Sequence, residues 1–387
     1  MNTYLIEPLA PLVFRSGKPF SGQSGADGAN FPLPSSMAGM LRTVTADQNN
    51  QPFSDSLKQQ AVYGPLLVRY KDEKTLDVLV PKPADAVYFK NSADKTELVR
   101  LTPLAFEKGC ESDLPNALLP VQMEQKIKGK PATGAQYWTL KDLIEWQYKK
   151  LAFTDIEAHG LSALPTEQRT HVALNDTSLA SDDGRLFQTA GLDFQSSLLS
   201  KTASNNALSQ QRFGFIAQTN AALKNDLVIL GGERRLSRLI KLDKQYALPT
   251  NLKLTQEVNT KKGLKITLLT PAIFEKGYLP QWIDADSLTG ICPLLPNVTL
   301  TLRAVAIDRW LPVSGWALSY KDQDGQIKQK PKAMRKAVAA GAVYWFAVEG
   351  NIPKNLHELL WLKPLSDDTQ DQKDGFGLML PAAWQAV

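Results

Sequence analysis

The chain has few residues of the types that hold metals or form disulfide frameworks. Its two cysteines, Cys110 and Cys292, lie far apart and outside any CxxC pattern, so neither a disulfide nor a thiolate zinc site is indicated. The three histidines, His159, His171 and His357, form no HExxH or His-x-His arrangement. We therefore expect no metal and no cofactor.

Long apolar runs are also missing. No uninterrupted apolar segment approaches the roughly 20 residues needed to cross a bilayer, and the N-terminus has no basic stretch before its apolar part. We therefore expect no membrane partner and a cytoplasmic location. The length of 387 residues, with 43% hydrophobic and 21% charged residues, predicts two or three folded domains with their own cores.

The formal net charge is only +5, but the basic residues are concentrated. Residues 201–245 contain eight Lys or Arg against three Asp or Glu, and residues 321–336 contain six against two. A localised basic surface attracts polyanions by neutralising phosphates and releasing counterions. A solvated basic face would have the same composition, so charge alone leaves both interpretations open.

Apolar runs of strand length dominate the sequence, and helical patterns are few. Helical spacing or capping signals predict helices after Pro34, over residues 139–151 and at NLHELLWL. Two strands, RTHVALN and RLFQTAGLDF, are joined by a polar turn-forming stretch and predict a projecting hairpin. The polar, weakly periodic stretch 245–263 predicts a domain junction.

Eight motifs in chain order resemble those of a known family. They are VFRSGKPF, PLPSSMAGMLR, RTHVALN, DGRLFQTAGLDF, GGERR, SGWAL, PKAMRKAVAAGAVYWF and GFG. Together they resemble the third subunits of the Cmr complex, the type III-B CRISPR effector, which belong to the RAMP superfamily. Residues 45–140 match this family weakly, so no contact is assigned there.

The resemblance implies an α+β fold of two ferredoxin-like (RRM-like) domains with long insertions and a projecting β-hairpin. The N-terminal RAMP domain would span residues 1–248, and the C-terminal domain, with a glycine-rich loop, residues 249–387. It further implies a non-catalytic, RNA-binding subunit of an antiviral ribonucleoprotein. Such a subunit would hold the 5′ handle of the crRNA and contact the large polymerase-like subunit and the backbone RAMP subunit.

Several segments carry the residue types that bind single-stranded RNA, namely aromatic rings, cations and accessible backbone amides. The segment Arg212-Phe213-Gly214-Phe215 loosely resembles the core of an RRM motif, although its phenylalanines would equally pack one face of a strand. Gly375-Phe376-Gly377 matches the position of the RAMP glycine-rich loop, where missing side chains let N–H groups approach phosphate.

Two further segments combine glycines with cations. Gly231-Gly232-Glu233-Arg234-Arg235 carries guanidiniums suited to bidentate phosphate contact, with Arg238 expected one helical turn away. A surface turn paired with carboxylates is the alternative. Arg15 and Lys18 follow the first strand, and Arg42 lies on the next helix, where an anion could be seated. Turn chemistry alone explains these glycines equally well.

The predicted hairpin carries a third group. Arg169 and His171 alternate along one strand and face the same side. The resemblance to RAMP subunits implies a β-hairpin, called the thumb, that displaces or kinks bases along the guide RNA. Phe187, near Arg185, is either the residue that inserts between bases or an ordinary core residue. The lysine-rich loop that contains Lys328, Lys330, Lys332, Arg335 and Lys336 is either an RNA contact or merely solvated. The full predicted RNA-binding set is Arg15, Lys18, Arg42, Arg169, His171, Arg185, Phe187, Arg212, Gly231, Gly232, Arg234, Arg235, Lys332, Arg335, Lys336, Gly375 and Gly377.

Two other functions stay open at this point. The first is a RAMP-type crRNA-processing endoribonuclease in which His171 acts as general acid or base. The second is a protein-only assembly adaptor whose basic loops meet acidic surfaces of partner proteins.

Overall fold

The computed structural model describes most of the chain and divides it into two compact units. It covers residues 1–14, 28–71, 76–115, 118–124, 128–194, 212–243, 251–321 and 327–386, without the side chains of 182–185, 318–321 and 327–329. Unit 1 comprises Met1–Asp77, Leu164–Tyr246 and Pro312–Arg335; unit 2 comprises Val78–Ala163, Ala247–Leu311 and Lys336–Val387. Each unit is thus assembled from three stretches of sequence, and a domain boundary at residue 248 stays a prediction.

The sheet of unit 1 is antiparallel, with the first strand of the chain in its interior. Its strands within this unit run in the order β12-β13-β1-β11-β2. They are β1 (Asn2–Pro8), β2 (Val62–Tyr70), β11 (Arg212–Thr219), β12 (Asp226–Ile229) and β13 (Leu236–Lys241). Strands β11 and β12 lie in RFGFIAQT and DLVILGG, two of the apolar runs of strand length in the sequence.

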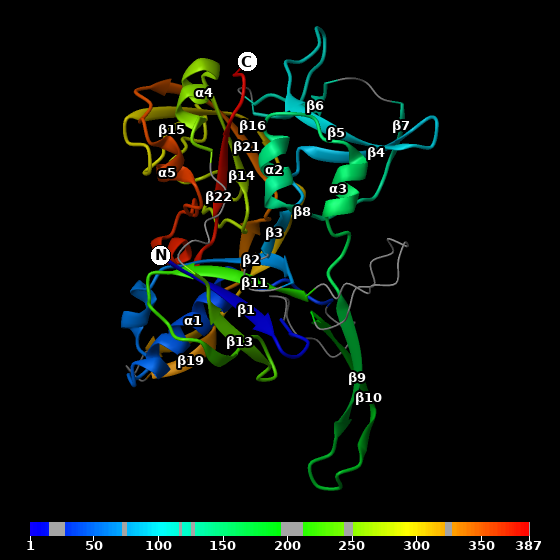
Figure 1. Cartoon of the computed structure of the whole chain (residues 1–387), viewed down its shortest axis with the longest axis vertical. Coiled ribbons are helices and arrows are strands. Elements are labelled where there is room, and N and C mark those ends of the chain that lie inside the picture. The colour runs from blue at the N-terminus through cyan, green and yellow to red at the C-terminus, as the bar shows by residue number, and fades with distance from the viewer. Residues whose placement is uncertain are drawn as a thin grey trace. The chain divides into compact units, whose positions relative to one another are not determined.

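Helix α1 (Pro34–Gln48) packs against β2 in unit 1 (Figure 1). Pro34 occupies the first turn, where its fixed φ favours helix and its missing N–H costs nothing. Met37, Leu41 and Val44 repeat at helical spacing and are buried. The predicted helix is therefore confirmed, and a 3₁₀ turn, Asp55–Gln59, follows it.

Strands β9 (Thr166–Leu174) and β10 (Ser181–Leu192) form a separate two-stranded sheet. Figure 1 shows this hairpin extending well beyond β1 and β13 of the same unit. The prediction of a projecting hairpin is confirmed. A second hairpin of unit 1 pairs β18 (Trp316–Lys321) with β19 (Ile327–Pro331).

Unit 2 contains a five-stranded antiparallel sheet in the order β15-β16-β21-β14-β22 and a four-stranded one in the order β6-β5-β4-β7. The first comprises β14 (Gly263–Leu268), β15 (Thr289–Ile291), β16 (Val298–Ala306), β21 (Val343–Gly350) and β22 (Met379–Ala383). The second comprises β4 (Ala86–Asn91), β5 (Thr96–Pro103), β6 (Val121–Met123) and β7 (Gly129–Pro131). Strand β3 (Leu76–Pro81) pairs with β8 (Tyr137–Thr139), and β17 (Trp310–Val313) and β20 (Arg335–Val338) span the unit boundaries.

Five helices of unit 2 are short. They are α2 (Leu140–Trp146), α3 (Phe153–His159), α4 (Leu254–Lys261), α5 (Leu356–Leu360) and α6 (Thr369–Asp374). Helices α4 and α5 pack on β22, where Val258 and Leu360 are buried in one apolar cluster with residues of the five-stranded sheet. Helix α5 confirms the prediction from NLHELLWL, whereas α4 replaces part of the polar junction expected over residues 245–263.

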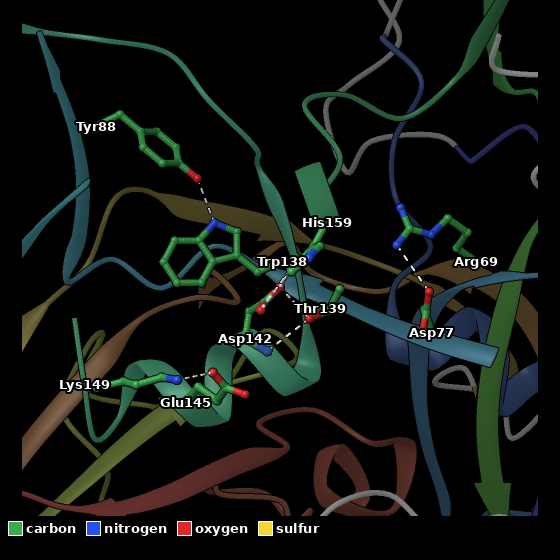
Figure 2. Close-up of polar contacts among 9 residues, drawn as sticks. All are labelled: Arg69, Asp77, Tyr88, Trp138, Thr139, Asp142, Glu145, Lys149 and His159. Atoms are coloured by element: carbon green, nitrogen blue, oxygen red, sulfur yellow. Dashed lines mark hydrogen bonds and ion pairs between the residues drawn. The ribbon is translucent and has the colours of Figure 1, made fainter. Parts of the chain in front are cut away.

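Helix α2 begins where the sequence predicts and ends earlier. Thr139 caps it by accepting a hydrogen bond from the Asp142 N–H at 3.0 Å, and its hydroxyl donates to the Asp142 carboxylate at 2.6 Å (Figure 2). The same carboxylate contacts Nδ1 of His159 at 3.3 Å. The helix stops at Trp146, whose carbonyl accepts a hydrogen bond from the Arg100 guanidinium instead of continuing the helical pattern to residue 151.

Candidate nucleic-acid interface

Three segments that the sequence singled out meet in unit 1, next to the chain that leaves β1. Leu12 exchanges two backbone hydrogen bonds with Leu192 at the base of the β9–β10 hairpin, at 2.9 and 2.8 Å. The next residue, Val13, accepts a hydrogen bond from the N–H of Gly232 at 2.8 Å. The loop of Arg15 and Lys18, which follows, lies outside the described residues. The segment formed by Leu12 and Val13 is therefore bonded both to the base of the hairpin and to the turn between β12 and β13.

Gly231 is needed at this junction for two reasons. Its φ of +79° lies in the left-handed region, and a Cβ there would meet the Val13 carbonyl oxygen at 2.8 Å. Gly232 donates its N–H to the same oxygen. These glycines fix the turn, and an RNA contact through the N–H of Gly232 would require breaking that bond.

The arginines of this region are balanced in part by carboxylates. Arg169 pairs with Glu167, and Arg235 pairs with Glu233 at 2.5 Å. The hydrogen bond from Arg169 lowers the pKa of Glu167 below its usual value, and the charge of Arg235 adds to that effect. The two pairs therefore act on each other across the hairpin base. Arg234, exposed at a φ of +50°, has no ionic partner among the described residues.

Above the base, the hairpin has an aromatic face. His171 and Phe187 are paired across the strands, and their rings stack at 5.1 Å with an interplanar angle of 15°. Nε2 of His171 lies 2.8 Å from the hydroxyl of Thr189, and Phe187 is 46% exposed. The backbone places Arg169 on the same face. An exposed ring fixed by a second ring can stack with an unpaired base. The side chain of Arg185 lies outside the described residues.

A second pair of arginines shares one buried carboxylate. Glu7 of β1 accepts from Arg212 and Arg238 at 2.9 Å each, and from the hydroxyl of Tyr70 at 2.9 Å. The guanidinium of Arg212 also lies 4.8 Å from the Tyr70 ring centroid. Burial, reinforced by the charge of Glu7, raises the pKa of Tyr70. Both arginines are half-exposed, so this cluster presents one net positive charge to solvent.

The phenylalanines beside Arg212 are buried and offer no ring to an RNA base. Phe213 and Phe215 are buried, and Phe215 packs edge-on against Phe31 at 5.5 Å. Gly214 between them leaves room for the Ile6 carbonyl oxygen, which a Cβ would approach to 2.7 Å. The interpretation of this segment as a packed strand is confirmed, and only Arg212 remains a candidate contact.

Arg42 is a correction to the anion site predicted near the N-terminus. Its side chain is buried, and its guanidinium donates to the Gln60 carbonyl at 2.8 Å and to that of Lys58 at 3.5 Å. Because these carbonyls follow α1 in the chain, Arg42 ties the helix to the next segment and is not available to a phosphate. Arg238 is a second correction, because it lies on strand β13 and not one helical turn from Arg234.

The C-terminal basic segment is more ordered than a solvated loop. Pro331 pairs with Trp316, and Lys332 donates its N–H to the Gly315 carbonyl at 2.8 Å, so this part belongs to the β18–β19 hairpin. Lys332, Arg335 and Lys336 are exposed. The ammonium of Lys336 lies 5.5 Å from the ring centroid of Trp310, a cation–π distance.

The late glycine motif has a conformational explanation. Gly375 ends α6 at a φ of +92°, and Gly377 has a φ of +83°. The N–H groups of Gly375, Phe376 and Gly377 donate to the carbonyls of Gln372, Asp371 and Pro271. All three donors are therefore used within unit 2, and a phosphate contact through them would require a change in the loop.

Sequence reasoning missed residues that complete these clusters. Glu7 is an acidic residue within the apolar run TYLIEPL, and that position was the available signal for a buried partner of arginine. The exposed rings of Trp310 and Trp316 carried no pattern that separated them from core residues. In the part of the chain that the structure describes, no group of His, Cys, Asp or Glu is placed to hold a metal ion. No described helix is long and apolar enough to span a membrane.

Comparison with known proteins gives the family. A search of curated proteins returns no match. Chains in two solved structures resemble this one. Both structures are of the type III-B Cmr-beta complex bound to cognate target RNA, and one of them also contains AMPPnP. Each is 16% identical and covers 89% of this chain and 86% of its own, with TM-scores of 0.45 and 0.44. The family model for the CRISPR-associated protein Cas_Cmr3 matches residues 4–384. The chain therefore belongs to the Cmr3 family of CRISPR-associated proteins.

Proposed function

We propose that this chain is a non-catalytic RNA-binding subunit of a type III-B CRISPR ribonucleoprotein in antiviral defence. It holds the 5′ handle of the crRNA and docks the large polymerase-like subunit and the backbone RAMP subunit. Its two ferredoxin-like domains provide the scaffold, and it acts in the cytoplasm. Membership of the Cmr3 family supports the assignment to this complex.

The observation that carries the RNA-binding role is the grouping of cations and an aromatic stack in unit 1. The β9–β10 hairpin carries Arg169 with the stacked rings of His171 and Phe187 on one face. Its base is joined through residues 12–14 to the turn that carries Arg234. Cations beside exposed rings suit a strand that offers a phosphate and a π-face at every nucleotide.

The same geometry supports a role in binding over one in cleavage. Nε2 of His171 is engaged by the hydroxyl of Thr189, and its ring lies flat against Phe187. With Nε2 engaged, general acid or base catalysis by His171 would fall to Nδ1 alone, which would have to lie within hydrogen-bond reach of the reacting oxygen. A stacked and hydrogen-bonded imidazole is better suited to holding a base.

The test compares crRNA carrying its own 5′ handle with crRNA carrying a scrambled handle, each titrated into the purified full-length chain in EDTA. We expect a preference for the native handle, affinity that falls as salt rises, and intact RNA. The variant Arg234→Glu should weaken binding, and Lys354→Glu, at an exposed position of unit 2, should not. Equal affinity for both handles, or cleavage lost in His171→Ala, would contradict the proposal.

A further inference from the structure

Strand β12 lies at an end of the unit 1 sheet. It is the first strand in the sheet order, and β13 is its sole partner among the described strands. Its four residues, Asp226 to Ile229, pair in antiparallel register with Leu239 to Leu236. Edge strands of this kind leave one row of backbone groups without a ladder.

The ladder parity shows which groups point outward. Leu230 donates its N–H to the carbonyl of Arg235 at 3.0 Å. Since bonded and non-bonded pairs alternate along an antiparallel ladder, Val228 is bonded to β13, whereas the backbone groups of Leu227 and Ile229 are not. The carbonyl of Leu236, opposite Ile229, points away from β12 toward the β1 side, where it accepts a hydrogen bond from the N–H of Leu9 at 3.0 Å. The N–H and C=O of Ile229 and the C=O of Leu227 therefore point away from the sheet. No hydrogen bond reaches them from any described residue, and the Leu227 N–H is capped by the Asp226 carboxylate at 2.8 Å.

The side chains at these positions are apolar and exposed. Leu227 is 60% exposed and Ile229 is 52% exposed, and they share a face because they alternate along β12. Leu236 lies opposite Ile229 and is 47% exposed. Three neighbouring aliphatic side chains at a free edge form a patch that the fold itself does not use.

The charge next to this patch is positive. Arg238 lies opposite Leu227 and is half-exposed, while Glu7 divides its single charge between Arg238 and Arg212. Arg234, on the turn that leads into β13, is exposed and without an ionic partner among the described residues. A ligand lying along β12 therefore meets Arg234 beyond one end of the aliphatic patch and Arg238 at the other, where the carboxylate of Asp226 already accepts hydrogen bonds from Gln48 and from the Leu227 N–H.

We infer that β12 is a docking edge that accepts an extended, acidic strand of a partner protein as an additional antiparallel or parallel strand. Free N–H and C=O groups at alternate residues match the backbone of a polypeptide, and Leu227, Ile229 and Leu236 would cover its apolar side chains. RNA offers neither match, since aliphatic side chains give its bases little to stack on. This inference shares Arg234 with the handle-binding role but does not depend on that role, because the free edge of β12 and its aliphatic side chains take no part in it.

The test removes the outward-facing N–H of Ile229 by substitution with proline. In Ile229→Pro the ladder with β13 is kept, because Ile229 donates nothing to it, but an added strand loses a donor and meets the proline ring. Ile291→Pro places a proline on β15, the end strand of the five-stranded sheet of unit 2, and serves as the control, because the outer side of β15 is already bridged to Ile283 and is not a free edge. Circular dichroism and thermal melting establish that both variants fold.

Each variant is then assembled with the other subunits and crRNA of its own complex and followed by native mass spectrometry and amide hydrogen exchange. For the wild type we expect the Ile229 amide to exchange about tenfold more slowly after assembly than in the free chain. Ile229→Pro should weaken retention of one subunit about tenfold, and Ile291→Pro should not. Three results would overturn the inference: unchanged exchange on assembly, protection by crRNA alone, or self-association of the free chain that Ile229→Pro abolishes.

Discussion

The most deeply buried ion pair of unit 2 joins Lys265 to Asp85. Asp85 is fully buried and also accepts a hydrogen bond from the Trp146 indole at 3.1 Å. Burial lowers the pKa of Lys265, and the charge of Asp85 opposes that change. Removing one partner of such a pair leaves the other charge buried without compensation.

We expect Lys265→Met to lower the free energy of unfolding by about 3–5 kcal/mol, because it strands the Asp85 carboxylate. Adding Asp85→Leu should recover much of that loss, since the pair is then replaced by apolar groups. Denaturant unfolding curves of both variants measure the effect, with the exposed Lys354→Met as control. A single variant as stable as the wild type would show that the carboxylate finds another partner.

A pH dependence at alkaline pH follows from Tyr137 of β8. Burial raises the pKa of its hydroxyl from 10.0 to about 12. Between pH 10 and 12 the unfolded chain therefore loses this proton and the folded chain keeps it, so stability falls as pH rises through that window. Tyr137→Phe should flatten the decline by up to about 2 kcal/mol, measured as the difference between unfolding free energies at pH 9.5 and pH 11.5. An unchanged slope would mean that other tyrosines carry the effect.

Among the elements, the β9–β10 hairpin is the best test of which face binds RNA. Phe187 lies on the face of the His171 stack, and its neighbour Leu186 lies on the opposite face. Since base stacking contributes about 1–3 kcal/mol per base, Phe187→Ala should weaken binding of handle-bearing RNA by about fivefold or more. Leu186→Ala removes a similar area from the other face and should bind as the wild type does, measured by fluorescence anisotropy. Equal losses would point to the hairpin's rigidity as the cause.

Element types were largely predictable from the sequence, because β9, β10 and α1 carry strong local signals. Pro34 and the spacing of Met37 and Leu41 predict α1 without tertiary information. The length of α2 was not predictable, since its end depends on Arg100, about 46 residues away in the chain. The site was harder still: Arg42 resembles a free cation in sequence, and only the carbonyls of residues 58 and 60 reveal it as a structural residue.

At the scale of the whole molecule, the two units interleave along the chain. Residues 78–163 belong to unit 2 although unit 1 both precedes and follows them. One change of unit falls between Tyr246 and Ala247, in the polar stretch from which a domain junction was predicted, and four others fall elsewhere in the chain. The concentrated charge of residues 201–245 was informative about the site, because part of it, Arg234 and Arg235, lies next to the hairpin base.

The distribution of charge over the molecule also predicts how RNA binding responds to salt. Each phosphate contact contributes about 0.7 to the slope of log affinity against log salt for a single strand. Arg234 is free of ionic partners among the described residues, whereas Arg235 is paired with Glu233. Arg234→Gln should therefore lower the slope by about 0.7, and Arg235→Gln by clearly less, because Glu233 already offsets its charge. Titrations between 50 and 300 mM salt measure both slopes, with Lys354→Gln as control, and equal decreases would show that the Arg235–Glu233 pair opens on binding.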